Sequence, residues 1–200
     1  MAETARVNSP RRDELLERAY QYVLEHGLAG MSLRPLAATI GSSPRVLLFL
    51  FGSKDALVRA ILARARADEL AFLADAGQPP ADLPGLVRAT WRWLAGEQHR
   101  RLLTLWVEAY GRSLADPAGP WADFARQTVA DWLALLAAAQ PGSGQPEDGA
   151  GQARASAAAE RTLALAVLRG ALLDLLATGD TARASAAVGR YLEWLDRPGR

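Results

Sequence analysis

The chain has 200 residues, half of them apolar, and a formal net charge of +1 at pH 7, so it can bury a core and is not a low-complexity chain. It has no cysteine, which excludes disulfides and thiolate metal sites. No segment offers the roughly 18 uninterrupted apolar residues of a membrane span, and the first residues lack the apolar core of a signal peptide. We therefore expect a cytoplasmic protein without a membrane partner.

The charge is unevenly distributed along the chain. Residues 1–66 hold ten Lys or Arg and six Asp or Glu, whereas residues 67–200 hold thirteen and sixteen. A basic first third joined to a mildly acidic remainder is typical of a chain of which only the first part approaches nucleic acid.

The first part is predicted to contain one long helix followed by two short ones. Ser9-Pro10 provides a cap and a proline at the first helical position, and Gly27 ends that helix. A short helix follows Ser32 and stops at Gly41, and Ser43-Pro44 starts another that covers about residues 45–49. Two short helices joined by a glycine-containing turn and braced by a longer helix are typical of the helix-turn-helix arrangement.

The remainder is predicted to be longer helices, because apolar residues recur at helical spacing and strand-like alternation is absent. The expected helices cover about residues 54–76, 82–95, 98–114, 121–139, 153–178 and 181–195. The segment 141–152 is rich in Gly, Pro and Gln and reads as a mobile loop. The predicted fold class is all-α, with about nine helices.

Residues 27–57 carry several motifs in one order: Ser32-Leu33, Leu36-Ala37, Gly41-x-Ser43 and Phe51-Gly-Ser-Lys-Asp-Ala-Leu57. This stretch resembles the signature of tetracycline-repressor (TetR) family regulators, and with the helix before it the resemblance covers about residues 10–64. It implies a helix-turn-helix DNA-binding domain at 1–57 and a helical ligand-sensing and dimerisation domain at 58–200. The implied function is that of a repressor released from a pseudo-palindromic operator by a small-molecule ligand; activation stays open.

The chain departs from the family at the end of the recognition helix. Members usually carry a tyrosine and a histidine where this chain has Leu48 and Leu50. The resemblance places Leu48 against DNA, but a leucine cannot make the hydrogen bond that the tyrosine commonly gives to a phosphate.

Polar and small residues at the start of the recognition helix are the expected DNA contacts. Ser43, Pro44 and Arg45 occupy that end, which enters the major groove, and Arg45 can bond guanine O6 and N7 together or lie along a phosphate. Further phosphate contacts are expected from Ser32, whose helix end favours anions. Others are expected from residues of the preceding helix and, by resemblance, from the chain's only lysine; these are Arg34, Thr39 and Lys54.

The last two helices are the expected interface of a homodimer. Leu163–Leu176 is apolar nearly all round, which implies burial on two sides, although a purely intramolecular core helix is an alternative. The residues expected at the interface, some of them small enough for close approach, are Val167, Gly170, Ala171, Tyr191 and Leu195.

Aromatic residues on the middle helices suit either ordinary core packing or a ligand pocket with a few polar groups. The candidate lining residues are Trp91, Trp106, Glu108, Tyr110, Phe124, Trp132 and Arg169. Arg169 could instead form a structural ion pair with Asp174 or Glu108.

Two other classes of function compete with a regulator. An enzyme using the aromatic pocket is disfavoured because the sequence has no Walker motif, no nucleophile elbow and no histidine pair at metal-binding spacing. We expect no cofactor, metal site or catalytic residue. A helical dimerising module that does not bind DNA is the other alternative, and Leu48 and Leu50 keep it open. The expected partners are a double-stranded DNA operator, an unidentified small-molecule effector and a second copy of the chain.

Overall fold

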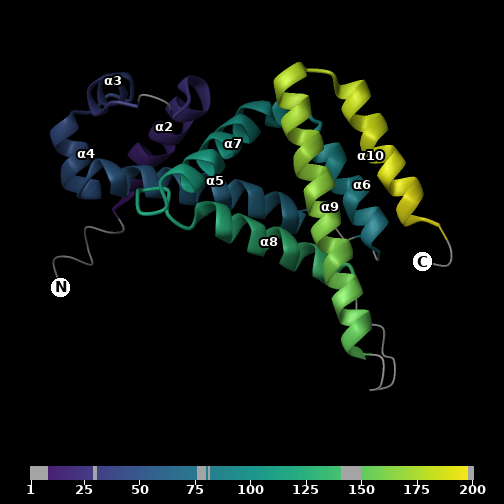
Figure 1. The fold of residues 1–200 in the computed structure, drawn as a ribbon. Helices are drawn as coiled ribbons and strands as arrows, with labels where there is room; N and C mark the ends of the chain where they lie inside the picture. Colours follow the sequence, from purple (N-terminus) through teal and green to yellow (C-terminus); the bar gives the residue numbers. More distant parts are fainter. Residues whose placement is uncertain (1–8, 29–30, 76–79, 81, 141–149, 198–200) are drawn as a thin grey trace. The chain divides into compact units, whose positions relative to one another are not determined.

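The computed structural model describes residues 9–28, 31–75, 80, 82–140 and 150–197. Every regular element in these ranges is a helix, which confirms the all-α prediction (Figure 1). The elements in chain order are α2 (Pro10–His26), α3 (Leu33–Thr39), α4 (Pro44–Phe51), α5 (Lys54–Asp75), α6 (Leu83–Leu94), the 3-10 turn η1 (Glu97–His99), α7 (Arg100–Ala115), α8 (Phe124–Ala138), α9 (Ala150–Thr178) and α10 (Thr181–Leu195). None of these helices is long and apolar enough to cross a membrane.

The helices form two compact units. Unit 1 comprises Met1–Asp75 and Arg101–Ala125, and unit 2 comprises Ala76–Arg100 and Arg126–Arg200. Unit 1 therefore holds α5 and nearly all of α7 in addition to the first three helices. The predicted division at residue 57 concerns function and stays a prediction.

Local sequence signals start and end the helices of the first part. The Ser9 hydroxyl accepts a hydrogen bond from the Arg12 N–H at 3.2 Å, and the Ser43 hydroxyl accepts one from Val46 at 3.3 Å. Ser53 caps α5 by accepting from Ala56 at 3.0 Å, whereas the Ser32 side chain makes no capping hydrogen bond. Gly27 follows α2 with a φ of 75°, a backbone geometry that costs glycine little.

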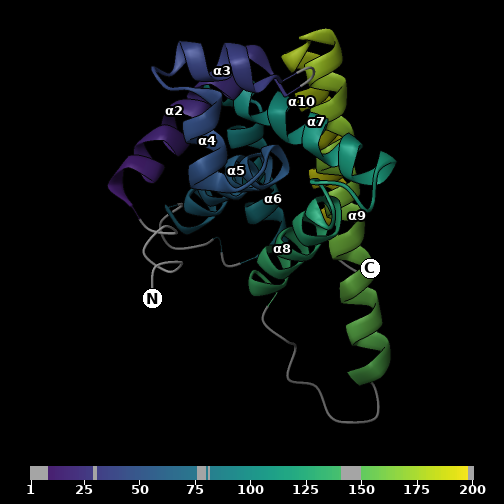
Figure 2. The same ribbon diagram turned by 90° about the vertical axis from the view of Figure 1, so that its left-hand side faces the viewer.

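Unit 1 is organised around one apolar cluster. Figures 1 and 2 show α2, α3 and α4 grouped around the first turns of α5. Each of these helices, and α7, contributes fully buried side chains, among them Leu15, Tyr20, Leu36, Leu47, Ile61 and Ala109. Because burying one such aliphatic or aromatic side chain stabilises a fold by roughly 1.5–3 kcal/mol, this cluster holds the three-helix head against α5.

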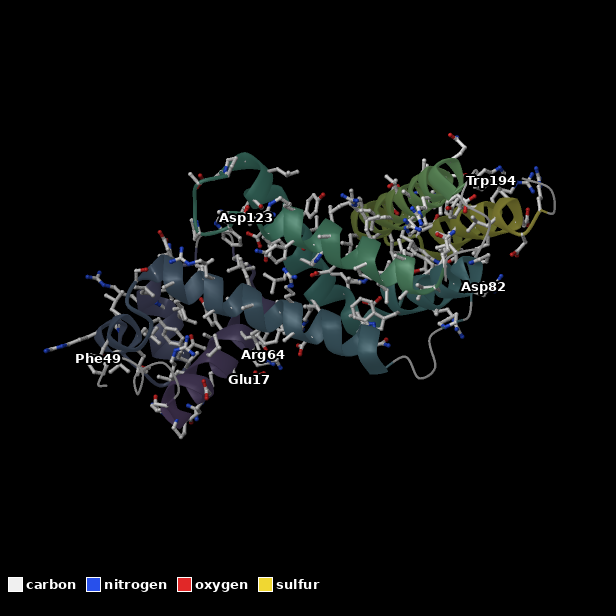
Figure 3. All side chains as sticks on the ribbon, turned by 90° about the horizontal axis from the view of Figure 1, so that it is seen from below. Glu17, Phe49, Arg64, Asp82, Asp123 and Trp194 are labelled. Carbon is white, nitrogen blue, oxygen red and sulfur yellow. The ribbon has the colours of Figure 1, made fainter. Side chains whose placement is uncertain are left out.

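A polar network also joins α2 to α5 within unit 1 (Figure 3). The Tyr20 hydroxyl donates to an Asp68 oxygen at 2.8 Å, and Arg64 Nε donates to Glu17 at 2.8 Å. Arg64 also pairs with Asp68, and its guanidinium lies 5.0 Å from the centre of the Tyr20 ring. Burial of the phenol, together with its hydrogen bond to Asp68, raises the pKa of Tyr20 well above its ordinary value.

Unit 2 is built from α6, α9 and α10, which contact one another, together with most of α8. Figures 1 and 2 both show α9 and α10 side by side. The Trp91 indole N–H of α6 donates to the Ser185 hydroxyl of α10 at 3.0 Å. At the turn between α9 and α10, Asp180 caps α10 and Arg183 pairs with Asp174 at 2.7 Å.

Three predicted boundaries were wrong. The helix expected from residue 98 is regular only from Arg100, because Glu97–His99 form a 3-10 turn. The helix expected from residue 121 begins at Phe124, since Asp123 has a φ of 66°, which a right-handed helix cannot accommodate. The predicted loop reaches residue 152, but α9 already begins at Ala150; residues 141–149 lie outside the described residues.

We predict that Tyr20→Phe changes how stability depends on alkaline pH. Because the folded state raises the Tyr20 pKa, the protonated phenol stabilises the fold below its unfolded pKa of about 10, and this contribution is lost as pH rises further. Urea unfolding from about pH 9 to about pH 11 is expected to weaken the wild type more steeply than the variant. At neutral pH the variant should be about 1 kcal/mol less stable. Parallel curves would contradict the prediction.

Candidate nucleic-acid interface

The turn between α3 and α4 is fixed by short-range contacts. Gly41 adopts a φ of 69°, and the Ser42 N–H donates to the carbonyl of Ala37 at 2.8 Å. From α2, Arg18 Nη1 donates to the Ile40 carbonyl at 3.2 Å. Since the turn is held from both sides, α4 has a defined orientation relative to α3.

Helix α4 has a buried side and an exposed side. Leu47 and Phe51 are buried in the core of unit 1. Because residues of a helix follow one another at about 100°, Arg45 and Phe49 lie opposite Leu47 and form the centre of the outward face. Both are exposed, and Figure 3 shows Phe49 at the outer edge of the head.

The predicted DNA contacts lie on the surface of this head. Seven of the eight predicted residues are exposed, namely Ser32, Arg34, Thr39, Ser43, Arg45, Leu48 and Lys54, and Pro44 is half-buried. The Thr39 hydroxyl donates to the Pro35 carbonyl of its own helix at 3.0 Å. Val46 and Phe49 were not among the predicted contacts, although the four-residue spacing of Arg45 and Phe49 places these two residues on one face of α4.

The electrostatics of the head favour an anion. No Asp or Glu occurs from residue 26 to residue 54, and this stretch includes Arg34, Arg45 and Lys54. Helices α4 and α5 also begin here, so the N–H groups of their first turns contribute partial positive charge. The first turn of α5 also carries exposed Asp55. A surface that combines three cations with helix N-termini suits a phosphate backbone.

Glu108, a predicted pocket residue, makes structural contacts. Its carboxylate accepts a hydrogen bond from the Leu28 backbone N–H at 2.9 Å and one from Arg112 Nε at 3.1 Å. The Arg112 guanidinium in turn lies 5.3 Å from the centre of the Trp121 ring. Glu108 of α7 therefore holds the chain segment that leaves α2.

The other predicted pocket residues fall in both units. Unit 1 contains Trp106, Tyr110 and Phe124 in addition to Glu108; unit 2 contains Trp91, Trp132 and Arg169. The Trp106 and Tyr110 rings contact each other at a centroid distance of 5.3 Å. Asp174, offered as a partner of Arg169, pairs with Arg183.

Two buried hydroxyls in unit 2 were not predicted. Thr90 on α6 and Thr128 on α8 are buried, and their hydroxyl oxygens have no hydrogen-bond partner. Because a buried polar atom usually has a partner, these two hydroxyls stand out as unpaired polar groups on α6 and α8. Their only sequence signal was a threonine within an apolar stripe.

The predicted dimer residues divide between the surface and the protomer's own core. Gly170 is exposed, Val167 and Ala171 are half-buried, and Tyr191 and Leu195 are buried. The described part of α9 also carries an exposed stripe of small and apolar residues at helical spacing, consisting of Leu163, Ala166, Gly170, Leu173 and Ala177. On α10, Trp194 is exposed as well.

A helix-turn-helix head joined to a helical bundle defines a class of DNA-binding regulators, and solved structures share this architecture. A TetR transcription regulator from Haloarcula marismortui has a TM-score of 0.72 and 19% identity, with 94% of this chain and 98% of that chain covered. The multidrug binding protein EbrR, complexed with imidazole, has a TM-score of 0.64 and 27% identity over 92% and 91%. Salmonella enterica GusR has a TM-score of 0.62 and 21% identity over 93% of each chain.

A sequence match to a characterised protein points to the same class of regulator. The HTH-type transcriptional regulator BetI from Rhizobium meliloti is 28% identical over 134 residues, which are 65% of this chain and 52% of BetI, so the chain spans about half the length of that relative. No protein-family model matches the chain. The chain thus shares the fold of TetR-family regulators, and the motifs of residues 27–57 resemble theirs.

We predict that Glu108→Ala destabilises the protein by about 1–3 kcal/mol, because it leaves the Leu28 N–H without its acceptor. Glu108→Gln should cost less, since the amide oxygen can still accept that hydrogen bond. Urea unfolding measures both, with Glu193→Ala as the control because the ion pair of Glu193 with Arg190 on α10 is exposed. Unchanged stability combined with an altered response to ligands would instead favour a pocket role for Glu108.

Proposed function

We propose that this protein is a sequence-specific DNA-binding transcriptional regulator that acts as a homodimeric repressor and leaves its operator when a small molecule binds. The observation that carries the proposal is the head itself: a helix-turn-helix whose predicted contact residues lie mostly on the surface, in a stretch without Asp or Glu from residue 26 to residue 54. Since it acts on DNA, we place it in the cytoplasm. We favour this function over an enzyme because the relatives it resembles are regulators.

The proposed division of labour on DNA follows from the position of each side chain. Arg45, at the start of α4, contacts a base edge, where a guanidinium can bond guanine O6 and N7 together. Lys54, Arg34 and Ser32 contact phosphates, which supply affinity and salt dependence without choosing a sequence. Because Leu48 stands where the family resemblance implies a tyrosine, one such phosphate contact is absent, and DNA affinity depends more on the cations.

The proposed partner of the exposed α9 stripe is a second copy of the chain. Small residues such as Gly170 allow two helices to approach closely, and exposed Leu173 supplies apolar area that water disfavours. A two-fold dimer presents two recognition helices to half-sites about 34–36 Å apart along the duplex. This geometry accounts for a pseudo-palindromic operator.

The proposed effector site is in unit 2. Trp91 and Trp132 supply buried aromatic surface there, and the Thr90 and Thr128 hydroxyls supply unused hydrogen-bonding capacity. The solved structures of EbrR with imidazole and with proflavin contain small ring compounds, which supports an aromatic effector for this chain. Such a ligand releases the operator only to the extent that it binds the DNA-free conformation more tightly.

We predict that Arg45→Ala costs about 1–3 kcal/mol of operator binding and relaxes the base preference at one position, whereas Lys54→Ala weakens binding to all sequences and reduces the salt slope by about 1. Gel retardation of the gene's own upstream fragment at several salt concentrations measures both. Arg190→Ala on α10 is the control arginine. If the wild type retards no fragment even at low salt, the proposed function is refuted.

We predict that Leu173→Glu raises the dimer dissociation constant by about tenfold or more, because a carboxylate would be buried in an apolar interface. Analytical ultracentrifugation measures the constant. Leu114→Glu is the matched control, since Leu114 is at least as exposed but lies at the end of α7. Equal dissociation constants for the two variants would remove α9 from the interface.

A further inference from the structure

The outward face of α4 is mostly apolar. Val46 is 39% exposed, Leu48 41% and Phe49 64%, and Arg45 is the one charged residue in this eight-residue helix. Phe49 and Arg45 occupy the centre of the face, with Val46 and Leu48 on its two flanks, because α-helical residues follow at about 100°. Three of the four outward side chains therefore cannot donate or accept a hydrogen bond.

A major groove offers one apolar group to such a face. Its base edges carry hydrogen-bond donors and acceptors, except for the C5-methyl group of thymine. Resting on the proposed DNA binding, we propose that α4 reads thymine methyl groups through Phe49 and Val46, so that each operator half-site contains thymines next to the guanine bound by Arg45.

The spacing along α4 limits where these thymines lie. Arg45 and Phe49 are one turn apart, which is about 6 Å along the helix axis, whereas successive base pairs rise by about 3.4 Å. With α4 lying along the groove, the thymine contacted by Phe49 is about two base pairs from the guanine contacted by Arg45. Val46, next to Arg45 in the chain, faces a methyl group closer to that guanine.

The charges around the face favour DNA over a protein as the occupant. The cations Arg34, Arg45 and Lys54 come from a stretch, residues 26–54, that contains no Asp or Glu, and Asp55 is the acidic residue next to it. A second copy docked through the same face would bring these like charges together, which costs free energy. A polyanion is attracted by these cations. DNA can therefore pair its phosphates with the cations and bring thymine methyl groups against the apolar side chains.

The test replaces thymine by deoxyuridine, which removes the methyl group and leaves base pairing unchanged. Duplexes enriched by the full-length protein from a randomised library define the half-site, and each thymine in it is then replaced singly. Each contacted methyl is expected to be worth about fourfold in affinity, the value of one buried methylene group. A second duplex carries cytosine where the half-site has a contacted thymine. Replacing that cytosine by 5-methylcytosine adds the methyl group back and tests the same contact.

Variants assign the contact to its side chain. Phe49→Ala should bind the thymine and deoxyuridine duplexes equally and keep the preference for guanine. Arg45→Ala should lose the preference for guanine and still bind the thymine duplex more tightly than the deoxyuridine duplex. Leu114→Ala is the matched control, because Leu114 has the same exposed fraction of 64%, and it should retain both preferences.

The outcomes separate this inference from the proposed function. Specific DNA binding that is indifferent to every thymine replacement overturns the methyl readout and leaves the regulator intact. Enrichment of no DNA overturns both. If Phe49→Ala leaves DNA binding unchanged but lowers self-association, the face is a contact between copies and the inference is wrong.

Discussion

The inward packing of Leu47 and Phe51 is the constraint on which the DNA-binding head depends. Helix α4 has eight residues, so two or three positions on one side anchor it and the remaining side chains face outward. Burying these two residues fixes the rotation of the helix about its axis. A rotation by about half a turn would expose Leu47 and bury Arg45 without a partner, which is costly. The same contacts thus stabilise the head and determine which side chains of α4 face outward, where the proposed DNA contact lies.

The observed orientation of α4 affects which side chains can contribute to DNA affinity and which can contribute to sequence specificity. At the position where the family resemblance implies a phosphate-binding tyrosine, this chain has Leu48, which is 41% exposed and has no group that can make that hydrogen bond. In the proposed complex, affinity comes mainly from the phosphate contacts of Arg34 and Lys54, and such contacts do not distinguish one sequence from another. The outward apolar side chains contribute where a base edge fits their shape. Losing a polar contact to the backbone therefore shifts the balance towards reading bases.

The helices of the head could be predicted closely because their signals are local. A serine followed by proline starts α2 and α4, and a glycine with positive φ ends both, so each boundary depends on neighbouring residues alone. The start of α8 failed for the opposite reason. The residues from Trp121 have an apolar pattern that suits a helix, but the left-handed conformation of Asp123 belongs to a turn that the pattern does not reveal.

Residues whose role depends on distant neighbours could not be placed from the sequence. Glu108 looked like a polar group among apolar ones, yet it accepts the N–H of Leu28, which is 80 residues away along the chain. Tyr191 and Leu195 followed the apolar stripe of α10, but that stripe packs within the protomer. Amphipathic spacing identifies a buried side without saying what buries it.

The position of Glu108 bears on how a signal can reach the head. It fixes the backbone between α2 and α3 from α7, while Arg64 and Asp68 hold α2 from α5. Both sets of contacts lie within unit 1. Hydrogen bonds and ion pairs therefore connect the head to α5 and α7, which are not part of the helix-turn-helix. A displacement of either helix must therefore move the head or break a hydrogen bond, and a broken hydrogen bond leaves a part-buried polar group without its partner. The head should consequently follow these helices as one body, which is the property that a repressor needs if a ligand is to alter the spacing of its recognition helices.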